Sequence, residues 1–99
     1  MAVTMVTYRK GGNHDAMVAA TRKLKDVLAK HGADSVGLNQ VAAGPDPGQW
    51  VILIGFANWE AFGKTVQSAL NDPAGGEAVA GLDAISEVVS RRVVAGIDL

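Results

Sequence analysis

The chain has no cysteine, only three prolines, and five aromatic side chains, which are two tryptophans, two phenylalanines and one tyrosine. Without cysteine it cannot form disulfides, thiolate nucleophiles or thiolate metal sites. No segment approaches the roughly 20 consecutive apolar residues that span a bilayer, and the first ten residues lack the pattern of a secretion signal. We therefore expect a soluble cytoplasmic protein that makes no membrane contact.

Charge of either sign is also scarce. Nine Lys and Arg residues oppose ten Asp and Glu residues, so the formal net charge is -1 and no basic stripe is present to contact phosphates. Nucleic-acid binding is not expected. The two histidines, His14 and His31, lie far apart and no carboxylate cluster accompanies them, so we expect no metal site.

What the chain does have is apolar residues, at 48 % of its 99 positions. That length fits a single domain covering residues 1–99 with a thin core. Runs rich in β-branched residues predict strands at 3–9, 34–44, 49–57 and 85–97. Apolar residues at three- and four-residue spacings predict helices at 15–31 and from Asn58 to Asp72. The glycine-rich segment that follows, "DPAGGEAVAGLD", is expected to form a loop with a single helical turn.

The order βαββαβ predicts an α+β, ferredoxin-like fold, in which a four-stranded antiparallel sheet carries two helices on one face. The stretch "WVILIGFA" is apolar on both of its alternating sets: one set is Trp50, Ile52, Ile54 and Phe56, and the other is Val51, Leu53 and Ala57. The helices can cover only one set. An exposed apolar patch of this size is typical of an interface, so we expect a homodimer formed through the open sheet face, a dimeric α/β barrel.

The element order, the hairpin and the run "FANWEAFGKTVQSALNDP" together resemble the antibiotic biosynthesis monooxygenase superfamily. The resemblance implies a pocket that oxidises quinol-like or polyketide aromatics with dioxygen and no bound cofactor. It also includes a haem-degrading branch that uses Asn, Trp and His. Here Thr7 and Tyr8 stand where that branch has its Asn, Thr65 stands where it has its Trp, and no histidine follows Asn71. Haem degradation is not expected.

Five residues are candidates for a site. Tyr8, Asn39 and Trp59 are candidate ligand-binding residues, with Tyr8 and Trp59 expected near the same edge of the sheet. His14 and His31 are candidate catalytic bases. Three of the five have a plainer interpretation: His14 as a solvated residue beside a turn, His31 as a partner of the helix dipole, and Trp59 as a core aromatic.

Two neighbouring features point to polar chemistry. The segment "YRKGGN" next to His14 offers glycines, free amides and the cations Arg9 and Lys10, which could hold an anion. Of the adjacent pair Arg91 and Arg92, one side chain must point to each face of the sheet, so at least one is expected to meet an acidic group, a partner or water in a cleft.

Two functions remain open. The first is a small protein that binds an apolar or aromatic ligand and has no chemistry of its own, and the second is a cofactor-independent monooxygenase. In either case the pocket is expected between the helices and the sheet, with Ala74 to Gly76 as a movable rim. A planar aromatic ligand would then lose affinity when Trp59 is replaced by Ala.

Overall fold

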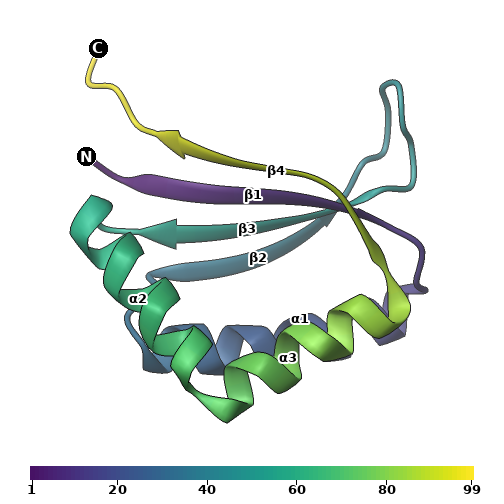
Figure 1. Ribbon diagram of the computed structural model, residues 1–99. Helices are drawn as coiled ribbons and strands as arrows, with labels where there is room; N and C mark the ends of the chain where they lie inside the picture. The colour runs from purple at the N-terminus through teal and green to yellow at the C-terminus, as the bar shows by residue number, and fades with distance from the viewer.

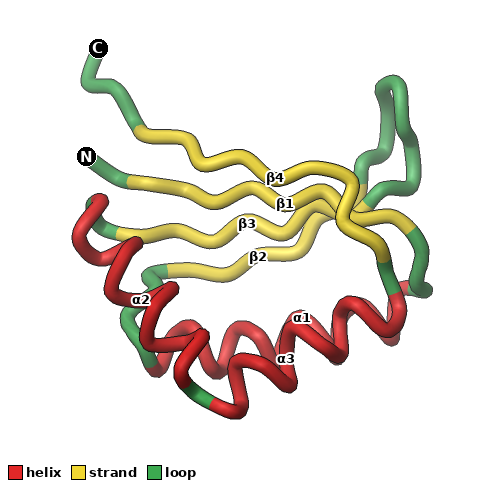
Figure 2. The backbone as a smooth tube through the Cα atoms, viewed as in Figure 1, coloured by secondary structure: helices red, strands yellow, loops and turns green.

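The computed structural model describes residues 1–99 and contains four strands and three helices (Figures 1 and 2). The chain order is β1 (Val3–Lys10), α1 (His14–Lys30), β2 (Ser35–Gln40), β3 (Trp50–Phe56), α2 (Trp59–Asn71), α3 (Pro73–Ile85) and β4 (Glu87–Ala95). The strands form one antiparallel sheet in the order β2-β3-β1-β4. Figure 1 shows all three helices on the same side of this sheet. The predicted ferredoxin-like α+β fold is confirmed.

The two predicted helices begin at side chains that satisfy free backbone amides. Asn13 accepts a hydrogen bond from the Ala16 amide at 2.9 Å and Asn58 accepts one from the Ala61 amide at 2.8 Å. At the far end of α1, Gly32 adopts a φ of 112°, a conformation that other residues rarely take. Both helices therefore lie within a residue or two of the positions that the sequence predicts.

A third helix stands where the sequence predicts a loop with one helical turn. Helix α3 has 13 residues. Asp72 caps it by accepting from the Ala74 amide at 3.0 Å, and Pro73 occupies its first turn, where a missing N–H costs nothing. The segment from Ala74 to Gly76 is thus the first turn of a helix, with Gly75 buried against α2. Because α3 continues to Ile85, β4 begins later than predicted.

The two faces of the sheet differ in what covers them. On the helix face, the β3 side chains Trp50, Ile52, Ile54 and Phe56 are buried in the core. The other β3 set, with Val51 and Leu53, is half-buried and faces away from the helices. The core is completed by residues of β1 and of all three helices: Val3, Met17, Leu24, Val27, Leu28, Ala69, Ala78 and Leu82.

The long β2–β3 connection projects beyond the sheet, at the end away from the chain termini (Figure 1). Strand β2 ends at Gln40, earlier than the predicted residue 44. The Val41 amide still donates a hydrogen bond to the Gln49 carbonyl at 2.8 Å at the base of this loop. None of the three helices combines the length and the apolar character needed to cross a membrane.

Candidate ligand cavity

A cavity of about 160 Å³ lies between the helices and the sheet, as the sequence predicts for a ligand pocket. All three helices and three of the four strands contribute to its wall. Its 15 lining residues include 11 hydrophobic ones. They are Met5, Thr7, Arg9, Leu24, Val27, Leu28, Ile52, Ile54, Val66, Ala69, Leu70, Gly75, Val79, Leu82 and Arg91. An apolar wall with few polar groups is typical of small-molecule sites.

The polar groups of the cavity come from neighbouring strands. Arg9 on β1 is only 3 % exposed, and its Nη1 lies 2.9 Å from Asp83 Oδ1 and 3.2 Å from Ser86 Oγ. Arg91 on β4 pairs in register with Thr7, and its Nε donates to Thr7 Oγ1 at 3.2 Å. Two arginines and one threonine therefore line a cavity that is otherwise apolar.

The outer wall of the cavity is formed by α2 and α3. Leu70 is 72 % exposed and Val79 is 38 % exposed, although both line the cavity, so its mouth lies beside them. Gly75 lies so close to the α2 backbone that a Cβ there would overlap the carbonyl oxygen of Ala69. The small residues Gly75 and Ala69 thus allow the two helices to meet while leaving space behind them.

Tyr8 and Trp59 lie outside this cavity and away from each other. Tyr8 pairs with Val51 and lies on the sheet face opposite the helices. Trp59 begins α2, is 52 % exposed, and contacts Phe62 edge to face at 5.9 Å between ring centroids. The expectation that they lie near each other is wrong. Strands β1 and β3 are antiparallel, so the end of β1 that leads into α1 and the end of β3 that leads into α2 lie at opposite ends of the sheet.

His14 and Asn39 do come together, in a shallow groove between α1 and β2 with a volume of about 340 Å³. His14 Nδ1 lies 3.1 Å from Asp15 Oδ1, and its ring centroid is 6.4 Å from that of Trp50. The nearby cation Arg9 turns the other way, into the cavity. The "YRKGGN" segment therefore does not bring His14 and Arg9 to one anion site.

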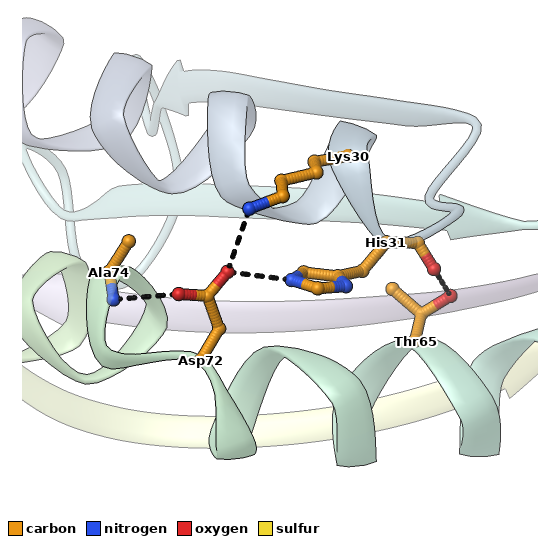
Figure 3. A network of polar contacts seen from close by, with 5 residues as sticks. All are labelled: Lys30, His31, Thr65, Asp72 and Ala74. Atoms are coloured by element: carbon orange, nitrogen blue, oxygen red, sulfur yellow. Dashed lines mark hydrogen bonds and ion pairs between the residues drawn. The ribbon is translucent and has the colours of Figure 1, made fainter.

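His31 forms a polar network with Asp72 where the end of α1 meets the α2–α3 junction (Figure 3). Its Nε2 lies 2.8 Å from Asp72 Oδ2, and Lys30 Nζ lies 3.4 Å from the same oxygen. Thr65 Oγ1 donates to the His31 carbonyl at 3.1 Å. Because neither His31 nor Asp72 lines the cavity, this pair joins helices and does not face a ligand there.

The network around Asp72 makes the stability of the fold depend on pH. Hydrogen bonds from His31 and the Ala74 amide, together with Lys30, lower the pKa of Asp72 from 3.8 to about 2. A carboxyl with a depressed folded-state pKa stabilises the fold above its unfolded pKa, and this contribution is lost as pH falls through the folded one. Between the two pKa values of about 2 and 3.8, we expect the free energy of unfolding to fall less steeply with decreasing pH in Asp72→Asn than in the wild type. Urea unfolding measures this free energy. Asp26→Asn, at an exposed carboxyl without an ion pair, is the control and should keep the wild-type slope.

Arg9 and Thr7 are polar residues that line the cavity although the sequence does not predict that they face it. They belong to the same alternating set as Val3 and Met5, and the other set of β1, with Val6 and Tyr8, is no more polar. The pattern alone cannot say which set meets the helices. Arg91 fits the prediction that one arginine of the pair enters a cleft, and Arg92 pairs with Val6 on the open face. The chain has no group of three or more His, Cys, Asp or Glu side chains placed to hold a metal ion.

No family model matches the sequence, and no curated protein matches it. Solved structures with the same fold are numerous. SnoaB, a cofactor-independent oxygenase from Streptomyces nogalater, superposes with a TM-score of 0.76 at 15 % identity, over 99 % of this chain and 95 % of SnoaB. A proposed antibiotic biosynthesis monooxygenase from Chloroflexus aurantiacus gives a TM-score of 0.68 at 15 % identity, with coverage of 99 % and 95 %.

A third structure, from Bacteroides fragilis, is described as a dimeric protein of unknown function with a ferredoxin-like fold. It gives a TM-score of 0.56 at 15 % identity, and the match covers 94 % of this chain and 92 % of that one. At such identities the likeness concerns backbone arrangement and does not transfer individual site residues. The chain therefore has the ferredoxin-like fold that the cofactor-independent oxygenase SnoaB and these other proteins share, over nearly its whole length.

Proposed function

We propose that this protein binds a small apolar or aromatic molecule in the cavity between its helices and its sheet. The supporting observation is the cavity itself, with 11 hydrophobic residues among the 15 that line it. An apolar cavity of roughly 150 Å³ engineered into another protein stays dry and binds benzene. At about 160 Å³, this cavity has room for one aromatic ring. A larger ligand would extend through the mouth beside Leu70 and Val79.

Narrowing the mouth tests this proposal. Val79→Phe places a ring at the entrance from a partly exposed position, so the fold should tolerate it. We expect toluene, phenol and naphthol to bind the wild type and to bind this variant about tenfold more weakly, the equivalent of about 1.4 kcal/mol of lost burial. NMR chemical-shift titration measures both affinities.

Trp59→Ala serves as the matched variant outside the cavity, and its affinities should equal those of the wild type. The reverse pattern, with Trp59→Ala weakened and Val79→Phe unaffected, would place the site at the start of α2 instead. Absence of any binding to the wild type would end the proposal.

The assembly that we propose with this function is a homodimer in which a second copy covers the open sheet face. That face carries Val6, Val51 and Leu53, which are half-buried, and Val94, which is exposed. Apolar side chains in such a row are costly in water and are typical of interfaces. The Bacteroides fragilis neighbour with this fold is described as dimeric. Packing two sheets face to face would produce a dimeric α/β barrel.

A second candidate function is cofactor-independent oxygenation of a quinol-like or polyketide aromatic. The observation that favours it is the shared fold with SnoaB, a cofactor-independent oxygenase, over 99 % of this chain. In this reading the guanidinium groups of Arg9 and Arg91 stabilise an ionised ring oxygen, since neither histidine lines the cavity. Oxygen uptake with dihydroxynaphthalenes and anthrones tests it. Binding without oxygen consumption would leave ligand binding alone.

A further inference from the structure

The cavity contains a buried cation whose hydrogen bonds are incomplete. Arg9 is only 3 % exposed, yet its Nε has no hydrogen-bond partner. Only Nη1 is engaged, by Asp83 and Ser86. A buried donor on a charged group is expensive to leave unpaired. The Arg9 guanidinium therefore has hydrogen-bonding capacity beyond its contacts with Asp83 and Ser86.

The charges around the cavity do not balance. Arg9 and Arg91 both line it, whereas the one carboxylate that pairs with either of them is Asp83, whose side chain is 59 % exposed. Arg91 is held by a neutral partner, since its Nε donates to the Thr7 hydroxyl. Water screens Asp83 more than it screens the buried Arg9, so the polar end of the cavity attracts an anion.

We propose that the natural ligand carries a carboxylate, which lies between Arg9 and Arg91 while its apolar body, about one ring in size, fills the rest of the cavity. This inference rests on the proposed ligand-binding function and names its ligand class. A guanidinium presents several donors in one plane, and a carboxylate presents two acceptors in one plane, so the two match better than a guanidinium and a single hydroxyl oxygen. Thr7, which lies opposite Arg91 in the register and two residues before Arg9 on the same strand, supplies a further hydroxyl.

A matched pair of ligands tests the carboxylate. Phenylacetate and phenylacetamide have nearly the same shape, and they differ in charge. We expect the wild-type protein to bind the acid at least about tenfold more tightly than the amide, which corresponds to about 1.4 kcal/mol. In Arg91→Met this preference should fall toward unity while the affinity for the amide is kept, because the methionine stem preserves the apolar wall. Isothermal titration calorimetry at neutral pH measures the four affinities.

Arg92→Met is the control, since Arg92 pairs with Val6 on the opposite face, and it should keep the wild-type preference. Arg9→Met should also abolish the preference, and circular dichroism establishes whether it is folded; if it is not, Arg91→Met alone decides. Equal binding of acid and amide by the wild type would overturn the carboxylate inference and leave the proposed function standing. Failure of both compounds and of toluene to bind would overturn the inference and the proposed function together.

Discussion

Ile54→Lys should abolish the fold, whereas Leu53→Lys, one residue away, should leave each chain folded and separate the two copies of the proposed homodimer. Ile54 is 5 % exposed and pairs with Met5 and Val36 on the helix face. An ammonium group there has no water and no carboxylate, and the cost of several kcal/mol approaches the whole stability of a small domain, about 5–15 kcal/mol. Circular dichroism and solubility measure the result.

Leu53 pairs with Val6 and Gly37 on the open face, where a lysine can reach water in a single chain. In the homodimer the same lysine would be buried between two sheet faces that already carry the cation Arg92. We therefore expect light scattering to report a dimer for the wild type and a monomer for Leu53→Lys. Gln67→Lys, at an exposed position of α2, is the control for added charge and should remain dimeric. A monomeric wild type at micromolar concentration would show that the homodimer proposal is wrong.

The fold was predictable where a periodic pattern and a boundary signal agree. In α1, apolar residues follow helical spacing between Asn13 and Gly32, and the structure uses both as the sequence suggests. In β3, apolar residues broken only by Gly55 predict a strand with two apolar faces. The structure buries one face under the helices and leaves the other open.

Helix α3 was not predicted because its glycine-rich composition disfavours a helix. Glycine is a poor helix former, and Gly75, Gly76 and Gly81 all lie within the helix. Tertiary packing outweighs propensity here, since Gly75 is needed for close contact with α2. One local signal does exist. Pro73 reads as the end of α2, but an Asp directly before a Pro also fits the cap and first residue of a new helix.

The place of the cavity was predictable, but most of its polar residues were not. The small residues Ala20, Gly63 and Ala69 on the helix faces suggest a gap there, and of these three Ala69 lines the cavity. Charge in a strand normally marks the solvent face, but β1 carries one cation in each alternating set, Arg9 in one and Lys10 in the other, so charge does not distinguish the two sets. The burial of Arg9 depends on Asp83 and Ser86, which lie far away in the sequence and meet it only once α3 is in place. No local pattern contains that information.

Gly75→Ala should destabilise the protein strongly, although alanine is the better helix former. The added methyl group would overlap the carbonyl oxygen of Ala69, which is backbone and cannot rotate away, so the start of α3 must shift from α2. Overpacking of this kind costs about 1–3 kcal/mol or more. For a domain of this size, each kcal/mol lowers Tm by about 4–8 °C. Calorimetry measures the change.

The neighbouring glycine provides a matched control for that substitution. A methyl group at Gly76 would meet nothing within 4 Å, so Gly76→Ala should gain about 0.5–1 kcal/mol from reduced freedom of the unfolded chain. The two variants have the same composition and differ only in position. Since Gly75 and Ala69 both line the cavity, Gly75→Ala should also weaken toluene binding while Gly76→Ala preserves it. Equal stability of the two variants would contradict the close contact of α2 and α3 and the shape of the cavity that depends on it.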